Sequence, residues 1–252
     1  MKTTDCFWEK PNLGVSAVEI TLGNDDTAEQ FAASGYENYG YAVVKVPVGC
    51  PACHGFLAQR GFVFAECQCL LSKQIDADVL ALPKVAAVAG DIRFASVRTQ
   101  SQLNHIKEQV AKGMFSTDRI ALDPHFGLEV AARRYANWLQ TDFDAARSQI
   151  HEVWLGLQHV GFMMTKTQGE VLHNVLNGLY PSYQRQGLGI ITAAAPLLYG
   201  LRCATPPRFE ATAISLNNMP VVRHYNYLNF TIDTLLYVFV KHQPQPSPQR
   251  AK

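Results

Sequence analysis

The feature that most constrains the fold of this chain is a glycine-bearing turn, Gln-Arg-Gln-Gly-Leu-Gly, at residues 184–189. Residues 171–180 before it alternate like a strand, and the apolar residues 188–201 after it are typical of a buried helix. Free N–H groups at a helix N-terminus bind phosphate, and glycine lets a ligand approach the main chain closely. The turn lacks the Gly-Lys-Ser/Thr of a P-loop and the third glycine of a dinucleotide-binding turn. We therefore predict a strand, a phosphate-binding turn and a helix, in that order.

Length and composition are those of an ordinary globular protein. The 252 residues suffice for one large or two modest domains, 48% of them are hydrophobic, 17% are charged, and the formal net charge is +1. No excess of one charge favours nucleic acid as a partner. The N-terminus lacks an apolar signal core, and no run approaches the ~20 apolar residues of a membrane span. We therefore expect a cytoplasmic protein without a membrane partner.

Strand-like and helix-like segments alternate along the chain, which favours the α/β (α+β) class with a mixed, twisted sheet flanked by helices. The predicted strands are 15–22, 41–46, 62–71, 92–97, 152–157, 161–167, 171–180, 209–215 and 231–240. The predicted helices are 26–33, 51–60, 100–111, 126–140, 188–201 and 218–227. A hairpin turn is expected at Thr167-Gln168-Gly169.

The same patterns predict a domain organisation. A smaller N-terminal α/β subdomain, 1–75, is followed by a linker, 76–90, and by a larger domain, 91–241. The tail 242–252 holds three prolines and little apolar material, so we expect it to be disordered.

A second motif follows the turn and identifies a family. The turn supplies Gln184, Gly187 and Gly189, and the later segment supplies Asn218, Val221, Tyr225, Asn229 and Phe230. Together these residues resemble the GNAT family of acyl-CoA-dependent N-acyltransferases, over roughly residues 90–240. The family has glycine where this chain has Asn229, and asparagine is the other residue that tolerates a left-handed helix end.

The resemblance implies the GNAT fold and direct transfer of an acyl group, most often acetyl, from acetyl-CoA or another acyl-CoA to a primary amine. Tyr225 would protonate the departing thiolate, because a phenol with a pKa of about 10 stays protonated at neutral pH. The cofactor-binding residues it implies are Leu179, Tyr180, Gln184, Arg185, Gln186, Gly187, Leu188, Gly189 and Asn218. A backbone N–H near Asn177-Gly178, where we expect a strand irregularity, would bind the oxyanion.

Alternatives stay open for several of these residues. Tyr225 on an amphipathic helix is also typical of packing, and Asn218 of a helix cap. The general base is undecided; the candidates are Glu152, Glu170 and His173.

A narrower resemblance concerns the acceptor. Segments 12–20, 57–65 and 116–124, with Tyr135 and Trp138, resemble the sugar-nucleotide N-acetyltransferases, including the enzyme that acetylates dTDP-4-amino-4,6-dideoxygalactose (TDP-fucosamine). This implies a nucleotide-linked amino sugar, with Arg119 near its anionic part and Asn177 near the substrate. A surface ion pair is the alternative for Arg119. Another small amine, a protein N-terminus, or a non-catalytic acyl-CoA-binding or metal-stabilised module also remains open, as does a homodimer.

The six cysteines, without a secretion signal, favour reduced thiols. Cys50-Pro-Ala-Cys53-His54 fits a haem-attachment pattern, and with Cys67 and Cys69 it offers four thiolates to zinc. The pattern is also found in thiol redox proteins. We favour a helix that Pro51 starts, with the cysteines as small apolar residues, so no metal is expected.

Overall fold

The computed structural model of the chain describes residues 1–243. The contacts between these residues divide them into two compact units. Unit 1 comprises Met1–Gln68 and the described residues from Leu235 onward, and unit 2 is Cys69–Thr234. The chain passes between the units within two long strands, β4 (Val63–Gln74) and β10 (Thr231–His242). Each unit is described by itself.

This division differs from the one expected from the sequence. Segment 76–90, expected to be a linker, contains the 3-10 helix η3 (Ala77–Ala81) and helix α4 (Pro83–Ala89). The second half of β10 belongs to unit 1 because it pairs with β3 there. The predicted disordered tail lies outside the described residues, apart from His242, which ends β10, and Gln243.

Unit 1 is built on strands in the order β1-β2-β3-β10. The pair β2–β3 is parallel, while β1–β2 and β3–β10 are antiparallel. Its elements are β1 (Lys2–Asp5), η1 (Phe7–Glu9), α1 (Lys10–Leu13), β2 (Ala17–Thr21), α2 (Ala28–Ala32), η2 (Tyr36–Asn38), β3 (Tyr41–Pro47) and α3 (Pro51–Gln59). Helix α2 lies in the connection between the parallel strands, as such a crossover requires.

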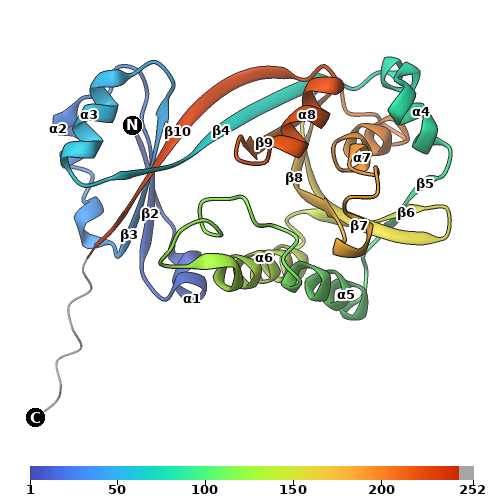
Figure 1. Ribbon diagram of the computed structural model, residues 1–252, viewed down its shortest axis with the longest axis horizontal. Coiled ribbons are helices and arrows are strands. Elements are labelled where there is room, and N and C mark those ends of the chain that lie inside the picture. The colour runs from blue at the N-terminus through green and yellow to red at the C-terminus, as the bar shows by residue number, and fades with distance from the viewer. Residues whose placement is uncertain (244–252) are drawn as a thin grey trace, which may run out of the picture. The chain divides into compact units, whose positions relative to one another are not determined.

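The core of unit 1 is apolar. Val18 and Ile20 alternate along β2, and they pack in one buried cluster with Val44 of β3, Phe31 of α2 and Leu57 of α3. Figure 1 shows α2 and α3 together beside these strands. A side-chain period of two along the strands therefore directs one face of them onto the two helices.

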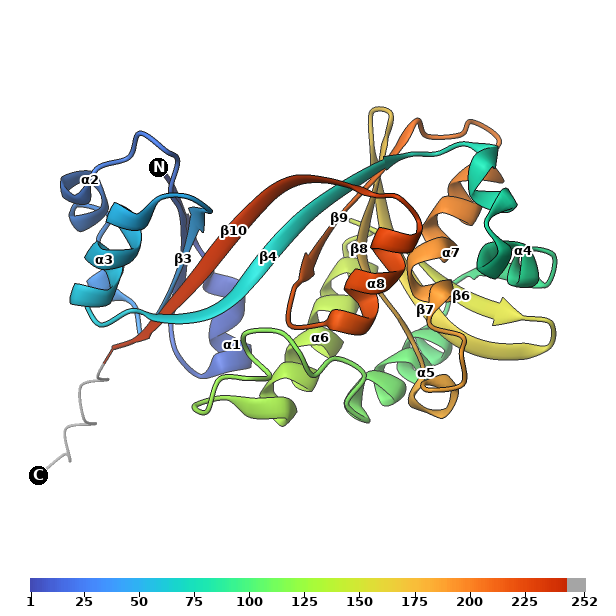
Figure 2. The ribbon, with the colours of Figure 1, turned by 45° about the horizontal axis from the view of Figure 1, so that its top comes forward.

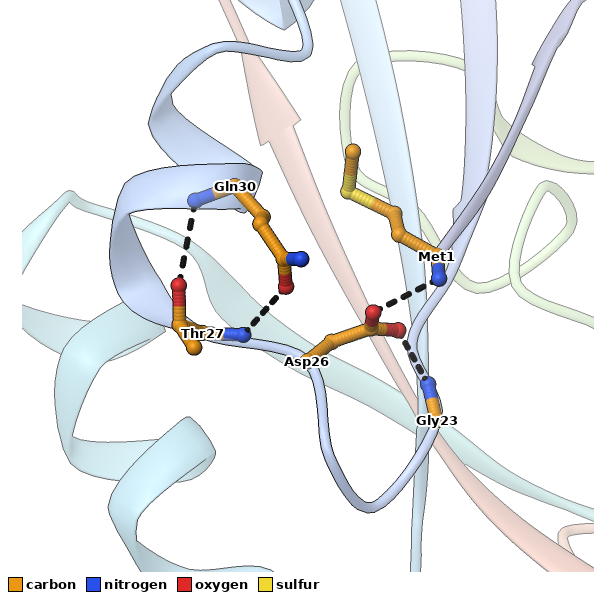
Figure 3. A network of polar contacts seen from close by, with 5 residues as sticks. All are labelled: Met1, Gly23, Asp26, Thr27 and Gln30. Atoms are coloured by element: carbon orange, nitrogen blue, oxygen red, sulfur yellow. Dashed lines mark hydrogen bonds and ion pairs between the residues drawn. The ribbon is translucent and has the colours of Figure 1, made fainter.

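Helix α2 begins at a network of polar contacts, which Figure 3 shows. The Thr27 hydroxyl accepts from the Gln30 N–H at 3.3 Å, and the Gln30 amide oxygen accepts from the Thr27 N–H at 2.8 Å. Asp26 accepts at 2.6 Å from both the Gly23 N–H and the Met1 ammonium group. The ammonium contact holds the pKa of Asp26 below its usual value. The Thr27 and Gln30 side chains thereby satisfy donors that the start of a helix leaves unpaired, while Asp26 fixes the turn before it.

Unit 2 contains the larger sheet, with strands in the order β4-β9-β8-β7-β6-β5. Consecutive strands from β5 to β8 are antiparallel, and β8–β9 is parallel, so the sheet is mixed, as predicted. Its remaining elements are β5 (Ile92–Ser96), α5 (Gln100–Ala111), α6 (Gly127–Asp144), β6 (Gln149–Leu155), β7 (Gln158–Gln168), β8 (Val171–Leu179), η4 (Pro181–Tyr183), α7 (Ile190–Leu201), β9 (Phe209–Ser215) and α8 (Met219–Tyr227).

Helices cover the sheet of unit 2. Leu103 and Ile106 of α5 and Leu139 of α6 form a buried cluster with Phe162 and Met164 of β7. Helices α7 and α8 lie beside each other (Figure 2). The hairpin predicted at Thr167-Gln168-Gly169 is confirmed, since Gln168 pairs with Val171 and Gly169 has a φ of 58°. Every helix among the described residues is too short or too polar to cross a bilayer.

Candidate active site

The parallel strands β8 and β9 separate part of the way along their length. Their register runs from Val171 opposite Phe209 to Asn174 opposite Thr212 and then ends, although β8 continues to Leu179. At the last pair, the Thr212 hydroxyl donates to the Asn174 carbonyl oxygen at 3.0 Å. Beyond this point, the edge of β8 that faced β9 is left for other partners.

A β-bulge lies at the point of separation. Along the β7–β8 pair, Met164 is opposite Leu176 and Thr165 is opposite Asn174, so Val175 is the extra residue. An extra residue interrupts the alternation of side chains along a strand. As a result, two asparagines three residues apart, at 174 and 177, lie on the same face and contact each other.

The irregularity that the sequence predicts at Asn177-Gly178 is therefore misplaced by two residues. Asn177 and Gly178 pair regularly with Met163 and Phe162. Gly178 is closely packed instead: a Cβ at this position would lie 3.0 Å from the terminal methyl group of Met114, which would have to shift slightly.

A chain of side-chain amides leads from helix α7 to Tyr225. The Asn177 amide donates to the Thr192 carbonyl oxygen at 2.7 Å and to the Asn174 Oδ1 at 3.0 Å. The Asn174 amide in turn donates to the Tyr225 hydroxyl oxygen at 3.0 Å and to the Glu210 Oε1 at 3.4 Å. The Asn174 amide is thus held through both its oxygen and its nitrogen, which fixes its position against the Tyr225 hydroxyl oxygen.

Tyr225 is buried and stays protonated. Its side chain comes from α8, is 3% exposed, and lies edge-on to Phe230 with ring centroids 4.8 Å apart. Burial, and then the nearby Glu210 carboxyl group, raise its pKa well above the usual value of 10.0. Because Asn174 donates to its oxygen, the hydroxyl proton is directed toward another acceptor.

Glu210 of β9 was missed by sequence reasoning. It is fully buried, and burial raises its pKa well above 4.5, which favours the neutral form. Its Oε2 has no hydrogen-bond partner among the described residues. In the sequence, Glu210 and Thr212 alternate with Ala211 and Ala213, which is typical of a strand with a solvated polar face. Only the proximity of this strand to the Tyr225 motif could have drawn attention to it.

A cavity of about 140 Å³ opens where the strands separate. Its lining residues come from α6, α7, α8, the separated ends of β8 and β9, and the loop before α6: Phe115, Thr117, Asp118, Tyr135, Asn174, Val175, Leu176, Asn177, Thr192, Thr212, Ala213, Ile214, Ser215, Asn218, Val221 and Tyr225. The lining contains no Arg or Lys, and its one carboxyl group is that of Asp118. Asp118 accepts from the Ala121 N–H at 2.7 Å and from the Tyr135 hydroxyl. The cavity therefore combines polar and apolar walls with a single carboxyl group at one side.

The predicted phosphate-binding turn precedes α7. Arg185 and Gly187 have φ values of 62° and 78°, so the backbone twice enters the left-handed region. The main-chain N–H groups of Gly187, Leu188 and Gly189 have no hydrogen-bond acceptor among the described residues. Concave turns with such free donors fit a phosphate.

The second glycine of the turn has a different role from the first. Gly189 has a φ of −55°, which any residue adopts. However, a Cβ at this position would overlap the His224 ring of α8. Gly187 is thus required by conformation, and Gly189 by the close approach of the two helices.

Other predicted cofactor-binding residues stabilise the turn itself. The Gln184 amide donates to the Leu179 carbonyl oxygen at 3.1 Å, and the Gln186 amide to the Ser182 carbonyl oxygen at 2.6 Å. The buried Tyr180 hydroxyl contacts the His159 Nε2 at 2.9 Å. The Tyr180 side chain therefore points into the protein, whereas Gln184 and Gln186 are exposed and their amides are held by main-chain carbonyl oxygens.

Two further predictions concern α8. Asn218 caps the helix, because its Oδ1 accepts from the Val221 N–H at 3.4 Å, and it also lines the cavity. Asn229 has a φ of 57° just after the helix, which confirms the left-handed end expected for it.

The remaining candidates lie away from the cavity lining. Arg119 is half-buried beside Asp118 but does not line the cavity. Buried Glu152 accepts from the Trp154 ring N–H at 3.2 Å, and Glu170 lies in the exposed β7–β8 turn. His173 pairs with Lys166 in the β7–β8 ladder. None of the three base candidates lines the cavity.

The expectation of reduced thiols is wrong for two cysteines. Cys50 and Cys53 form a disulfide at the start of α3. A Cys-x-x-Cys segment in the first turn of a helix brings the two Cα atoms within 5.5 Å, close enough for the bond. In the disulfide, Cys50 and Cys53 offer no thiolate to zinc, while Cys67 and Cys69 lie outside any disulfide.

Comparison with known proteins concerns the fold. No protein-family model and no curated protein matches the chain. A conserved protein of unknown function from Staphylococcus epidermidis ATCC 12228 is similar with a TM-score of 0.60 and 14% identity, over 91% of this chain and 84% of the other. A GCN5-related N-acetyltransferase from Kribbella flavida gives a TM-score of 0.55 and 12% identity, over 92% and 82%. A GCN5-related N-acetyltransferase from Sphaerobacter thermophilus gives a TM-score of 0.52 and 10% identity, over 86% of this chain and 65% of the other. The chain therefore has the fold of the GNAT N-acetyltransferases, as its sequence motifs predict.

Proposed function

We propose that this protein is an N-acyltransferase that moves an acyl group, most simply acetyl, from acyl-CoA to a primary amine. The observation that carries the proposal is the buried, protonated Tyr225 beside a cavity that opens between two separated parallel strands. The GNAT fold supports acyl transfer in general.

The residues present fit an acyl-CoA. The free N–H groups of Gly187, Leu188 and Gly189 suit the diphosphate, since main-chain donors bind phosphate without a cationic side chain. Asn218 and the separated edge of β8 offer polar groups to the pantetheine arm.

In the reaction, a neutral amine nitrogen attacks the thioester carbonyl carbon and the carbon–sulfur bond breaks. The amine loses one proton and the departing thiolate gains one, so an amide and a free thiol are formed. Tyr225 would supply the thiol proton and regain one from the amine. Asn174 acts on Tyr225 by orienting its hydroxyl, and Glu210 and Asn177 hold Asn174.

Two acceptor classes are candidates. The sequence resemblance favours a nucleotide-linked amino sugar such as dTDP-4-amino-4,6-dideoxygalactose, with Arg119 near its anionic part. A specific observation favours a second class, an amine without negative charge near the amino group, because Asp118 is the one charged residue in the cavity lining. A carboxylate attracts an ammonium group and repels a phosphate.

Calorimetry with CoA and acetyl-CoA, followed by measurement of CoA release with a panel of amines, tests the proposal. The panel includes the dTDP-amino sugar, a polyamine, an arylalkylamine, an amino acid and a peptide with a free N-terminus. Failure of well-folded protein to bind CoA overturns the proposal. Binding without turnover for any amine would favour a non-catalytic acyl-CoA-binding module.

Asp118→Asn separates the two acceptor classes. For a cationic amine we expect KM to rise by about tenfold, the effect of losing one close opposite charge. For a nucleotide sugar, KM should stay the same or fall. Asp91→Asn, at an exposed position between α4 and β5, is the control.

A further inference from the structure

A second chemically active feature lies in unit 1, at the start of α3. Cys50 is the N-cap of this helix and Cys53 lies in its first turn, so the disulfide closes over Pro51 and Ala52. Both cysteines are partly exposed, and the two residues between them are exposed. The bond is therefore at the surface, within reach of small molecules, unlike the buried thiols of Cys6 and Cys69.

The electrostatics of this helix end favour a thiolate once the disulfide is reduced. The first turn of a helix presents unpaired N–H groups and a partial positive charge to the N-cap. In α3 no side chain caps these groups, and no acidic residue lies in the first turn. A thiolate on Cys50 would accept from the N–H groups of Ala52 and Cys53, as thiolates at helix N-termini do.

The helix is anchored independently of the disulfide. The His54 ring contacts the rings of Tyr237 and Phe239 in β10, with centroids 4.9 and 5.5 Å apart. Leu57, one turn further along, is fully buried in the core of unit 1. Opening the disulfide therefore leaves the helix in place, so the two sulfur atoms stay close enough to join again.

We propose that Cys50 and Cys53 form a thiol–disulfide exchange site that takes small disulfides and thiols of the glutathione class. The Cys50 thiolate attacks one sulfur of oxidised glutathione, a mixed disulfide forms, and one glutathione thiolate leaves. The Cys53 thiol then loses its proton and attacks the Cys50 sulfur, which releases the second glutathione. The two protein thiols are oxidised, one glutathione disulfide is reduced to two thiols, and reduction of the protein is the reverse.

The test is a redox titration of the full-length native chain. The protein is equilibrated in buffers with graded ratios of reduced and oxidised glutathione, quenched in acid and labelled with a maleimide, and each cysteine is quantified by peptide mass spectrometry. We expect Cys50 and Cys53 to change together in one two-electron transition, while Cys6 and Cys69 stay unlabelled until the protein unfolds. Cys67→Ser, the control, should leave the midpoint unchanged.

A trapping experiment identifies the attacking sulfur. In Cys53→Ser, the mixed disulfide with glutathione should accumulate on Cys50, at least about tenfold faster than on Cys203 at neutral pH, because thiolates react and thiols do not. In the complementary variant Cys50→Ser, the mixed disulfide should form on Cys53 more slowly than it forms on Cys50 in Cys53→Ser.

Three outcomes would overturn the proposal. The disulfide opens only after denaturation, the two cysteines do not oxidise in any glutathione buffer, or purified protein holds one equivalent of zinc that protects both thiols. If Cys53→Ser does not fold, the wild-type titration alone decides. None of these outcomes bears on the acyltransferase proposal, which CoA binding tests separately.

Discussion

Two parallel strand pairs of the described residues, β2–β3 and β8–β9, are each joined through a helix, but only the second pair separates. In unit 1, β2 stays paired with β3 along its whole length, from Ala17 opposite Tyr41 to Thr21 opposite Lys45. In unit 2, β8 is paired with β9 only as far as Asn174, and a cavity opens beyond. The same local arrangement of strand, helix and strand thus yields a closed core in one place and a candidate active site in the other.

The buried side chains differ in the same way. The cluster between β2, β3 and their helices is apolar, and Phe31 stacks on Tyr36 with centroids 4.9 Å apart. At the end of the β8–β9 register, Asn174, Glu210 and Tyr225 are 6%, 0% and 3% exposed. Burial of polar groups costs free energy, so the polar cluster is the one that fits the proposed chemistry, whereas the apolar cluster stabilises unit 1.

Among the substitutions that test the difference between the polar and the apolar cluster, Tyr225→Phe should have the largest effect. Removal of one hydroxyl should lower kcat by about 10²- to 10⁴-fold, the range for loss of a general acid. The Kd for CoA and the unfolding transition should change little, because the ring keeps its contacts. Steady-state kinetics and calorimetry measure both quantities. Tyr227→Phe on the same helix is the control, and equal rates for the two variants would remove Tyr225 from the mechanism.

The opposite behaviour is expected in unit 1. Leu57→Ala should lower the free energy of unfolding by about 2–5 kcal/mol, since it leaves a cavity around a fully buried position. The Kd for CoA should not change. Denaturant titration gives the stability, and Val63→Ala, at a 65% exposed position, is the control. If Leu57→Ala lowers the free energy of unfolding no more than Val63→Ala does, the apolar cluster of unit 1 is not the stabilising region that we infer.

Glu210→Gln tests the polar cluster through pH. Burial raises the pKa of Glu210 in the folded protein above 4.5, so the folded state binds more protons than the unfolded one. The stability of the wild type should therefore fall as pH rises from 4.5 toward the folded pKa, by at most about 1.4 kcal/mol per pH unit. Glutamine does not titrate, so the variant should gain stability relative to the wild type over that window.

Urea unfolding between pH 5 and pH 8 measures this difference. Glu170→Gln, at an exposed turn position, should show no such trend. Parallel pH profiles for wild type and Glu210→Gln would show that burial does not perturb this carboxyl group.

The smallest effect is expected in the turn. Gly187→Ala places a Cβ at a φ of 78°, so the left-handed conformation of the turn becomes less favourable by about 1 kcal/mol. If CoA binds only to that conformation, the Kd for CoA should rise by about fivefold. Gly55→Ala in α3 lacks a positive φ and has open space around it, so it should be neutral or stabilising. Calorimetry compares them, and equal affinities would mean that the left-handed turn is not needed for the cosubstrate.

Local patterns in the sequence predicted most elements of the fold. The helix over Gln100–Ala111 and the strand over Phe209–Ser215 have the predicted bounds, because periodicity and capping signals act over a few residues. Short elements were not predicted: β1, α1 and α4 hold too few residues to show a period. The left-handed end at Asn229 was also readable, since it depends on one residue type in one place.

What the sequence by itself determined is the GNAT pattern of turn, helix and Tyr225 motif. Only the tertiary structure decided that Val175 is the bulge, that Asn174 and Asn177 share a face, and that Glu210 is fully buried next to Tyr225. The reason is physical. Periodicity is a property of neighbouring residues, whereas register and burial depend on hydrogen bonds and packing between segments far apart in the chain.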